Sequence, residues 1–495
     1  MTFDYKFENK KIAALGFAVE GESAVDFLLR QKADITVFDE KKEEDFEAEK
    51  LQKYKTVGVK FVFGPFGDLT SFDVIVRSPG VNPNIKSLEE ARQKGIPVVT
   101  GIDIFLNISP AYVIGVTGTK GKGTTSTLIY EMLKKEKSEI YLGGNIGTPP
   151  LSFLDILTPQ STVVLELSSF QLFDVTKSPN IAVVLMVTSE HMDFHASEEE
   201  YAAAKGNILK FQKPGDGSAP RQSTSAVSGS TELTVEASVP NGSGQAGSPH
   251  SYAVINVDYE NSRRMREAAC VPVFEVSRKQ TVSMGAYIKD GALIFVSQDG
   301  KKEKIINTGD VFIPGKHNLE NIGAAVTVAK ILGISNESIT EVLKTFKGLK
   351  YRLQFVRDVN GVRYYNDSCG TRPESTIAAI RAFRNQKIII LGGSSKGSDF
   401  SELAKIISEE KTIKTIIGIG VEWPRIKEAL RGAGVTQPEI IENCTSMGVI
   451  VETAASEARA GDVVILSPAC ASFDMFKDYK DRGNQFEEAV LKIKK

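Results

Sequence analysis

The residues with the clearest chemical potential lie between Ala111 and Leu133, where an apolar run is followed by a glycine-rich loop and a helical pattern. Three glycines let the loop backbone turn with its N–H groups directed inward: Gly118, Gly121 and Gly123. Those N–H groups and the N-terminus of the next helix form a site that attracts anions. The order of strand, loop and helix predicts a phosphate-binding loop for a nucleotide.

Side chains in this loop suit the same purpose. Lys122 would place its ammonium on the β- and γ-phosphates, and Thr124 or Thr125 would offer a hydroxyl to Mg²⁺. In the usual pattern Ser or Thr follows the lysine directly, whereas Gly123 follows it here. An ordinary glycine-rich turn is the alternative interpretation. The predicted nucleotide-binding residues of the loop are Gly118, Thr119, Lys120, Gly121, Lys122, Gly123, Thr124 and Thr125.

Two further candidates follow buried strands predicted at Thr162–Leu167 and Ile181–Val187. Glu166 lies within the first apolar run, where a carboxylate is costly unless it binds a cation or pairs with a lysine. His191 comes shortly after the second run. Because ligands bind at the carboxyl ends of parallel strands, Glu166 and His191 are expected beside the loop, around Mg²⁺ and the γ-phosphate.

Length and composition restrict the class of protein. A chain of 495 residues is too long for one ordinary core, so two to four domains are expected. The chain has 60 Lys and Arg residues and 62 Asp and Glu residues, so it lacks the net positive charge that is typical of nucleic-acid-binding proteins. The four cysteines form no C-x-x-C pair, and no apolar segment resembles a signal peptide or a membrane span. A cytoplasmic protein without membrane insertion is expected.

Strand and helix signals alternate along the chain and predict an α/β fold with three domains. Residues 1–100 form a Rossmann-like N-terminal domain, 101–347 a central domain of the P-loop ATPase type, and 348–495 a Rossmann-like C-terminal domain. Residues 214–250 are rich in Ser and Gly and have no aromatic residue, so a flexible insertion in the central domain is expected.

Polar residues also gather at other predicted strand ends and helix starts. In the C-terminal domain these are Asn366–Ser368, Gly392–Lys396 and Ser467–Ser472, which are expected to converge on one sheet edge. In the central domain, Gly315–Asn321 precedes a helix predicted at Ile322–Leu332, where Asn and His could hydrogen-bond a base or ribose.

Taken together, these segments resemble the Mur ligase family, ATP-dependent amide-forming enzymes of peptidoglycan synthesis. The motifs GVTGTKGKGTT, GGNIG, LELSSFQL, TSEHMD and GKHNLEN match features of the whole family. LGGSSKGSDFSEL and LSPACASFDMFKDYKDRGNQF resemble its D-glutamate-adding members more specifically. The resemblance covers nearly the whole chain apart from the insertion. It implies a monomeric enzyme that uses ATP and Mg²⁺ to join D-glutamate to UDP-N-acetylmuramoyl-L-alanine through an acyl phosphate.

The resemblance also implies roles for individual residues. Those implied for catalysis are Lys122, Glu166, His191 and Lys205. Those implied for metal binding are Thr124, Glu166, His191 and Lys205, the last as a carbamate. Beyond the loop, those implied for ATP are His317, Asn318, Asn321, Arg352 and Asp367. Those implied for the UDP-linked substrate are Val19, Glu20, Asp39, Glu40, Ser78, Pro79, Gly80, Asn145 and His191. Those implied for the amino acid are Thr371, Lys396, Ser472, Phe473 and Tyr479.

Some positions depart from the family pattern. Gly123 resembles the arrangement in folylpolyglutamate synthases, and Glu20 is acidic beside the implied diphosphate site, where Thr is usual. Cys369 and Arg372 replace a common Lys and Asn. A folylpolyglutamate synthase-like ligase is therefore one alternative, against which the N-terminal α/β domain argues. A non-catalytic nucleotide-binding scaffold is another, against which the retention of Lys122, Glu166 and Lys205 argues.

Overall fold

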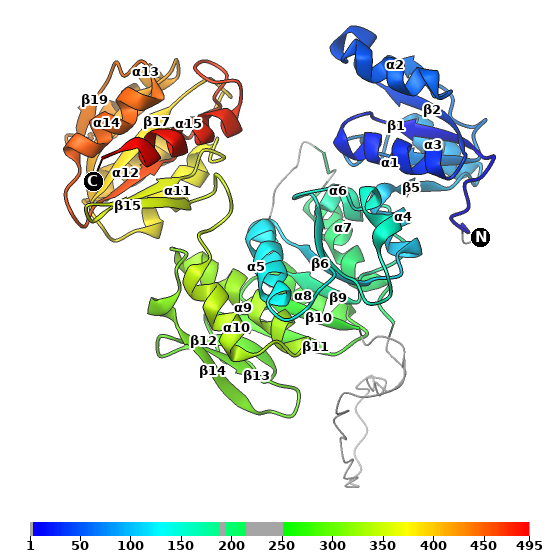
Figure 1. Ribbon diagram of the computed structural model, residues 1–495, viewed down its shortest axis with the longest axis horizontal. Helices are drawn as coiled ribbons and strands as arrows, with labels where there is room; N and C mark the ends of the chain where they lie inside the picture. The colour runs from blue at the N-terminus through cyan, green and yellow to red at the C-terminus, as the bar shows by residue number, and fades with distance from the viewer. Residues whose placement is uncertain (1–2, 189–193, 196, 214–250, 495) are drawn as a thin grey trace. The chain divides into compact units, whose positions relative to one another are not determined.

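The computed structural model describes residues 3–188, 194–195, 197–213 and 251–494. His191 and the insertion predicted at 214–250 lie outside the described residues. The chain forms two compact units (Figure 1). The first comprises Met1–Ile305 with Glu320–Ile339, and the second Ile306–Leu319 with Thr340–Lys495. An α/β fold is confirmed, whereas the domain boundaries at 100 and 347 stay a prediction.

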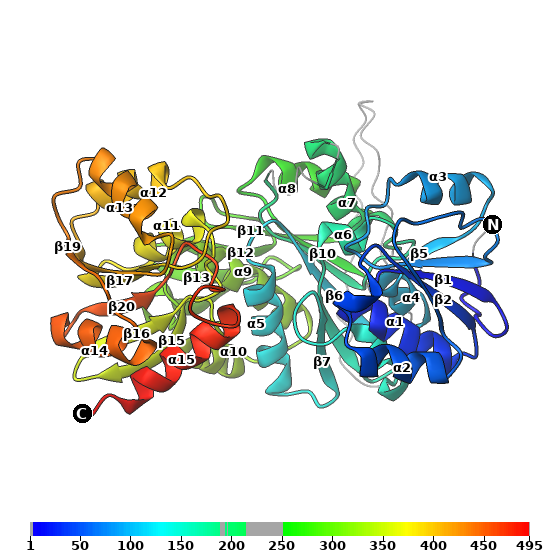
Figure 2. The ribbon, with the colours of Figure 1, turned by 90° about the horizontal axis from the view of Figure 1, so that it is seen from above.

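The N-terminal sheet of the first unit is parallel, with the strand order β3-β2-β1-β4-β5. Apolar residues of helices α1 and α2 cover one face, and those of α3 cover the other (Figure 2). The strand predicted at Lys11–Leu15 is confirmed to the residue. The elements are β1 (Lys11–Leu15), α1 (Val19–Arg30), β2 (Asp34–Asp39), α2 (Ala48–Thr56), β3 (Lys60–Phe63), β4 (Val74–Arg77), α3 (Lys86–Gln93) and β5 (Val98–Thr100).

The second sheet has the order β14-β13-β12-β11-β10-β9-β6-β8-β7 and is parallel from β7 to β12. Strand β6 lies between β8 and β9, so the loops after these three strands meet at one edge. The helices are α4 (Gly101–Ile108), α5 (Lys122–Lys134), α6 (Ser169–Leu172), α7 (Glu198–Lys210), α8 (Glu260–Met265), α9 (Lys316–Ile331) and α10 (Asn336–Thr345). The strands are β6 (Tyr112–Thr117), β7 (Ile140–Gly144), β8 (Thr162–Glu166), β9 (Ile181–Val184), β10 (Tyr252–Asn256), β11 (Val273–Ser277), β12 (Gly285–Lys289), β13 (Ala292–Val296) and β14 (Lys302–Asn307).

Helix α9 begins at Lys316, six residues before the predicted start at Ile322. Gly315, with φ of 97°, makes the turn directly before it. The polar run from Lys316 to Asn321 was predicted to precede the helix. It forms the first helical turns instead, so the predicted ATP-binding residues of this run lie on a helix.

The third sheet lies in the second unit and has the order β15-β16-β20-β17-β18-β19. Strands β15 and β16 are antiparallel, and the other pairs are parallel. Helices α14 and α15 cover one face, and α11, α12 and α13 cover the other. The elements are β15 (Gln354–Val359), β16 (Val362–Asn366), α11 (Pro373–Ala382), β17 (Lys387–Gly392), α12 (Ser401–Glu409), β18 (Ile413–Ile419), α13 (Trp423–Gly432), β19 (Glu439–Ile441), α14 (Met447–Glu457), β20 (Val463–Leu466) and α15 (Tyr479–Lys492).

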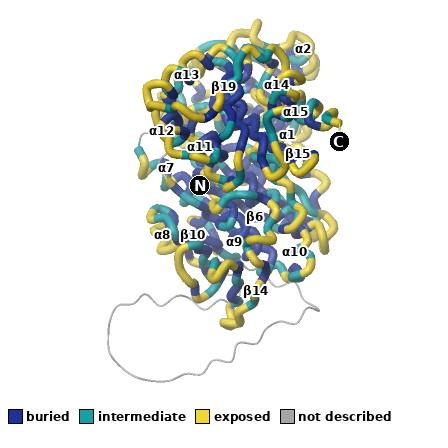
Figure 3. The backbone as a smooth tube through the Cα atoms, turned by 90° about the vertical axis from the view of Figure 1, so that its left-hand side faces the viewer, coloured by how far each residue is buried: buried dark blue, intermediate teal, exposed yellow. Residues whose placement is uncertain are grey.

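Burial follows the layers of each sheet. Figure 3 shows strands such as β6 as buried and surface helices such as α2 as largely exposed. In the first unit one apolar cluster runs from Phe27 on α1, through Phe105 on α4, to Leu165 on β8. The N-terminal and central sheets therefore share a continuous core. Among the described residues, no helix is long and apolar enough to cross a membrane.

Arg482 on α15 is a fully buried cation in the second unit. Its guanidinium donates to Ser368 Oγ at 3.0 Å and to the Ser368 carbonyl at 2.9 Å. It also donates to the carbonyls of Ala471 at 2.9 Å and Cys470 at 3.1 Å. Burial lowers the pKa of Arg482 to about 10, so the side chain stays cationic at neutral pH. It therefore joins the loop after β16 to the loop after β20.

We expect Arg482→Met to destabilise the second unit strongly. The change removes the donor of the buried Ser368 and Cys470 carbonyls, which should lower the free energy of unfolding by about 3 kcal/mol or more. Urea unfolding followed by fluorescence measures this loss. The control is Arg431→Met, an exposed position on α13, which should change the free energy by less than about 0.5 kcal/mol. Equal effects of the two substitutions would contradict the role given to Arg482.

Candidate active site

The predicted phosphate-binding loop connects β6 to α5. Gly121 has φ of 90° and caps α5, which begins at Lys122. A Cβ built on Gly121 would lie 2.1 Å from Asn321 Oδ1, and one built on Gly118 would lie 2.8 Å from Leu185 Cβ. The loop backbone is thus in close contact with α9 and with the end of β9. Only glycine fits these two positions, and the loop is held in a shape that suits anion binding.

Thr119 fixes the middle of this loop. Its N–H donates to Met186 O at 2.6 Å, and its hydroxyl donates to Thr188 O at 2.9 Å. The same hydroxyl lies 3.0 Å from the hydroxyl of Tyr201. The buried hydroxyl of Thr125, in the first turn of α5, has no hydrogen-bond partner among the described residues. The hydroxyls of Ser126 and Thr127, the next residues of the helix, are buried in the same way without a partner among the described residues.

Two lysines converge on one carbonyl of the loop. Lys122 Nζ donates to Gly118 O at 2.9 Å, and Lys205 Nζ, from α7, donates to the same oxygen at 3.0 Å. Lys205 is buried, and its ammonium lies 4.7 Å from the centre of the Tyr201 ring. Two ammonium groups this close to one another repel, and a bound anion would relieve that repulsion. The structure thus brings the predicted residues Lys122 and Lys205 together.

Glu166 lies at the end of β8, opposite Val116 in the register of β6. The side chain is buried, and its Oε1 accepts a hydrogen bond from Asn145 Nδ2 at 2.9 Å. The N–H of Asn145 donates to the Glu166 carbonyl, also at 2.9 Å. No lysine pairs with Glu166 among the described residues, which removes the alternative explanation for this buried carboxylate. Glu166 therefore lies next to the end of β6, from which the loop begins, and it holds Asn145, which was predicted for the UDP-linked substrate.

The predicted ligand His191 lies outside the described residues, but His195 is described. His195 is buried, its Nε2 is 3.0 Å from Ser169 Oγ, and its Nδ1 is 3.5 Å from Glu200 Oε2. These contacts attach the segment before α7 to α6. In the described part of the chain no group of three or more His, Cys, Asp or Glu side chains is arranged to hold a metal ion.

The first turns of α9 carry three of the residues predicted to bind ATP. Asn321 lies against Gly121 in the loop. Asn318 is buried, and its Nδ2 donates to Pro314 O at 2.6 Å. His317 lies over Gly315, where a built Cβ would be 2.6 Å from its Cε1. Of these, only Asn321 is placed against the phosphate-binding loop within the first unit.

Several residues predicted for the UDP-linked substrate lie at the carboxyl edge of the N-terminal sheet. Asp39 accepts from the N–H of Phe17 at 2.7 Å, and the Ser78 hydroxyl donates to Gly16 O at 3.0 Å. These bonds hold the β1–α1 turn between the ends of β2 and β4. A shallow pocket lies there, and its lining includes Gly16, Glu20, Gly21, Arg77, Ser78 and Pro79. Val19, Glu40 and Gly80 are exposed around it.

Glu20 contacts the central part of the first unit through α6. Gln171 Nε2 donates to Glu20 Oε1 at 2.7 Å. Burial raises the pKa of Glu20 to about 7, although the Gln171 hydrogen bond and the nearby Arg77 act in the opposite direction. At neutral pH this acidic side chain is therefore partly protonated, which reduces the repulsion that a diphosphate would meet there.

The sequence-based prediction missed Arg77, Gln171 and Asp174, which join the two sheets of the first unit. Arg77 Nε donates to Asp174 Oδ2 at 2.8 Å, and Arg92 Nη2 donates to Asp174 Oδ1 at 3.0 Å. A signal was present, because Arg77 ends the apolar strand VIVR and lies next to the predicted Ser78. A buried arginine at the end of a strand needs acceptors nearby.

In the second unit, Asp367 and Arg352 lie close together. Asp367 is buried, and it accepts from Ser467 Oγ at 2.7 Å and from the N–H of Leu353 at 3.1 Å. Burial raises the pKa of Asp367 to about 7, against the opposing effect of Arg352. Burial also raises the pKa of the Cys369 thiol, so Cys369 is neutral where the family carries a cation.

Four of the residues predicted for the amino acid lie on loops at the carboxyl edge of the third sheet, and the fifth, Tyr479, begins α15. Lys396 Nζ donates to Thr371 Oγ1 at 3.0 Å. Ser472 is buried, and the N–H of the exposed Phe473 donates to Ser394 Oγ at 3.0 Å. Tyr479 packs edge-on against the ring of Tyr351. The loops that carry Thr371, Lys396 and Ser472 are thus brought together, and both Lys396 and Arg372 are exposed cations on them.

Comparison with protein-family models gives three matches. Residues 10–100 match the Mur ligase MurD-like N-terminal domain, and 116–219 match the Mur ligase middle domain. Residues 351–470 match the Mur ligase glutamate ligase domain. These ranges follow the same order as the three predicted domains.

Full-length relatives agree with these matches. The chain is 38% identical to UDP-N-acetylmuramoylalanine–D-glutamate ligase of Acetivibrio thermocellus, over 99% of this chain and 98% of that protein. It is 34% identical to the protein of the same name from Thermoanaerobacter sp., over 99% of this chain and all of that protein.

Solved structures show the same fold at lower identity. UDP-N-acetylmuramate-alanine ligase MurC from Thermotoga maritima superposes with a TM-score of 0.54 at 15% identity, covering 98% of this chain and 99% of that one. MurF ligase from Thermotoga maritima in complex with ADP gives a TM-score of 0.52 at 19% identity, covering 98% of this chain and 96% of that one.

The raised pKa of Glu20 gives a pH prediction. A carboxyl group whose pKa is higher in the folded protein adds stability at low pH, and this stability is lost as pH rises toward about 7. Glu20→Gln keeps an oxygen that accepts from Gln171 but cannot ionise. Relative to the wild type, its free energy of unfolding should therefore gain on the order of 1–3 kcal/mol between pH 5 and pH 8. Denaturant titrations at both values measure this, with the exposed Glu49→Gln as the control. A difference that does not vary with pH would contradict the prediction.

Proposed function

Because the chain belongs to the Mur ligase family of ATP-dependent ligases, we propose that it joins D-glutamate to UDP-N-acetylmuramoyl-L-alanine in peptidoglycan precursor synthesis. The observation that carries the proposal is the full-length match to relatives named for that reaction, at 34–38% identity. The arrangement of the loop, Glu166 and Lys205 supports the same reaction class.

The reaction must make a carboxylate electrophilic. Transfer of the γ-phosphoryl group of ATP to the substrate carboxylate forms an acyl phosphate and ADP. The amine of the amino acid then attacks the acyl carbon, the amide bond forms, and inorganic phosphate leaves. Lys122 and the loop N–H groups supply positive charge where the phosphoryl group is transferred. This chemistry depends on positioning and charge neutralisation, and it needs no covalent nucleophile from the protein.

The loop and its neighbours suit ATP and Mg²⁺. The glycine cradle and the Lys122 ammonium favour phosphates, and His317, Asn318, Asn321, Arg352 and Asp367 are proposed for the rest of the nucleotide. Thr124, Glu166, His191 and a carbamate on Lys205 would hold Mg²⁺, since hard cations prefer oxygen ligands. Bound Mg²⁺ would neutralise part of the negative charge of the phosphates.

The two other substrates have separate proposed sites. The carboxyl edge of the N-terminal sheet, with Glu20, Asp39 and Ser78, is proposed for the uridine diphosphate part. The loops around Lys396, Thr371 and Ser472 are proposed for the amino acid, because a diacid needs one cation and several neutral donors. We further propose that the protein acts as a cytoplasmic monomer.

A folylpolyglutamate synthase-like activity, the same-class alternative suggested by Gly123, is disfavoured by the MurD-like N-terminal match at 10–100. A non-catalytic scaffold is disfavoured because Lys122, Glu166 and Lys205 are all in place around the loop.

Phosphate release tests the proposal directly. ATP turnover should require both UDP-N-acetylmuramoyl-L-alanine and an amino acid, with D-glutamate preferred. Lys396→Ala should raise the KM for D-glutamate about tenfold or more, because a charge-assisted contact is lost, while the KM for ATP stays within about twofold. The exposed Lys405→Ala on α12 is the matched control. Turnover with a folate alone, or a preference for L-glutamate, would overturn the corresponding part of the assignment.

A second test concerns the carbamate on Lys205. A carbamate is an anionic oxygen ligand, and its nitrogen keeps one N–H that can still donate to Gly118 O. Lys205→Arg keeps a positive charge but cannot form this ligand, so turnover should fall about a hundredfold or more while the protein stays folded. The control Lys210→Arg lies on the exposed side of the same helix and should behave as wild type. With ¹³C-bicarbonate, a carbamate NMR signal should appear in wild type and be absent from Lys205→Arg. Wild-type turnover in Lys205→Arg would refute the carbamate.

A further inference from the structure

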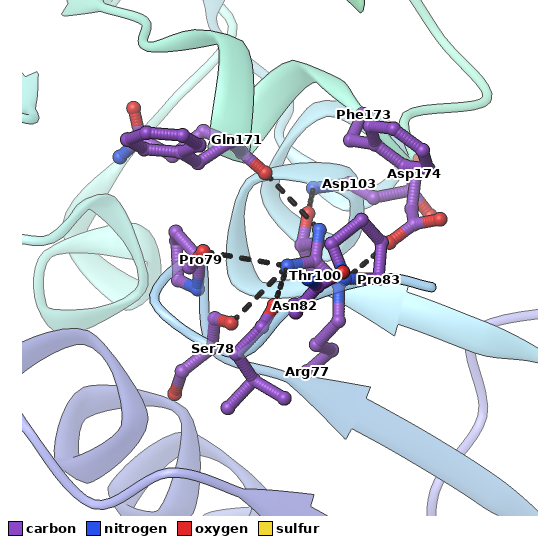
Figure 4. A network of polar contacts seen from close by, with 12 residues as sticks. Arg77, Ser78, Pro79, Asn82, Pro83, Thr100, Asp103, Gln171, Phe173 and Asp174 are labelled. Atoms are coloured by element: carbon purple, nitrogen blue, oxygen red, sulfur yellow. Dashed lines mark hydrogen bonds and ion pairs between the residues drawn. The ribbon is translucent and has the colours of Figure 1, made fainter. Parts of the chain in front are cut away.

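Arg77 lies at the end of β4, and its side chain is fully buried between the N-terminal sheet and the segment after β8. Figure 4 shows the guanidinium between Ser78 and Pro79 on one side and Asp174 on the other. On the central side, Nε donates to Asp174 Oδ2 at 2.8 Å and Nη2 donates to Phe170 O at 3.1 Å.

The third nitrogen of Arg77 holds the loop that follows β4. Nη1 donates to Val81 O at 2.7 Å and lies 3.3 Å from Ser78 O and 3.4 Å from Pro79 O. Three carbonyls of this short loop thus face one cation. The loop is therefore closed around the guanidinium, and its shape depends on where that group lies.

Asp174 also accepts a hydrogen bond from a second arginine of the N-terminal part of the unit. Arg92 Nη2 donates to Asp174 Oδ1 at 3.0 Å, and Arg92 Nη1 donates to Pro83 O at 2.6 Å. One carboxylate therefore holds two nearby points of the chain after β4, Val81 through Arg77 and Pro83 through Arg92.

The segment that anchors Arg77 also leads to the phosphate-binding loop. Phe170 and Gln171 lie on α6, which begins three residues after Glu166. Gln171 contacts Glu20, and Ser169 contacts His195. A shift of Arg77 would therefore move the loop at Ser78–Val81 relative to the strand end that carries Glu166.

We propose that Arg77 is a positioning residue that fixes the Ser78–Val81 loop against α6. It thereby fixes the uridine diphosphate site relative to the place where the carboxylate of the UDP-linked substrate is phosphorylated. This inference rests on the proposed function. The role requires arginine, because its planar fork donates in several directions at once, whereas lysine offers a single ammonium. A displaced loop would bind the UDP part less tightly and would hold the far end of the substrate in poorer geometry.

The experiment compares Arg77→Lys with wild type in steady-state kinetics and in calorimetric binding of UDP. The KM for UDP-N-acetylmuramoyl-L-alanine and the Kd for UDP should each rise about tenfold or more, as expected for loss of about one good contact. The KM values for ATP and D-glutamate should stay within about twofold. Asp174→Asn should shift the same two constants in the same direction, and the double variant should be no worse than Arg77→Lys, since both changes break one network.

The matched control is Arg30→Lys. Arg30 also joins the two sheets, through Asp155 at 2.8 Å and Leu151 O at 3.2 Å, but it does not touch the Ser78–Val81 loop. Its constants should stay within about twofold of wild type. Circular dichroism establishes that each variant is folded; if Arg77→Lys is not, Asp174→Asn alone decides.

Two results would overturn the positioning role. The first is an unchanged KM for UDP-N-acetylmuramoyl-L-alanine and an unchanged Kd for UDP in the folded variants. The second is an equal rise in the KM values for all three substrates. Wild type that neither binds UDP nor turns over the UDP-linked substrate would instead refute the proposed function, and this inference with it.

Discussion

The candidate active site depends on the phosphate-binding loop between β6 and α5, where glycine leaves the backbone without side chains at two close contacts. Gly118 and Gly121 let the chain pass close to β9 and α9, and the Gly118 carbonyl accepts from both Lys122 and Lys205. Positive charge is thereby concentrated at one end of a parallel sheet, where the loops after β6, β8 and β9 already meet. A side chain at Gly121 would displace Asn321, and one at Gly118 would collide with Leu185 and Met186.

In each unit a buried arginine holds loops at the edge of a sheet in one conformation. Loops that bind ligands have few apolar residues, so they need another means of holding one shape. Arg77 binds the carbonyls of the Ser78–Val81 loop, and Arg482 binds those of the loops after β16 and β20. In each case a guanidinium replaces the hydrophobic contacts that a loop cannot make. Arg77 has a carboxylate partner in Asp174, whereas Arg482 relies mainly on backbone carbonyls and on Asp367 and Asp474 nearby.

Much of the fold could be predicted from sequence, because buried parallel strands such as β1, β6 and β8 are continuous apolar runs. Glu166 was recognisable because a carboxylate in such a run requires an explanation. The start of α9 was predicted wrongly, since polar residues fill its first turns. Arg77 was missed because its acceptors are carbonyls and Asp174, which lies 97 residues away and has no sequence signature of its own. Contacts made by backbone atoms across long separations cannot be read from residue types.

The shared core of the first unit bears on how such enzymes can diversify. Phe27, Phe105 and Leu165 belong to one apolar cluster, although the boundary between two conserved modules falls among them. Exchange of the N-terminal module between related ligases would expose mismatched apolar surfaces on both sides of the junction. Recombination at that point should therefore succeed only when the matching faces of α1 and α4 are inherited together. Divergence of the N-terminal module is therefore constrained by its packing against the central part of the unit.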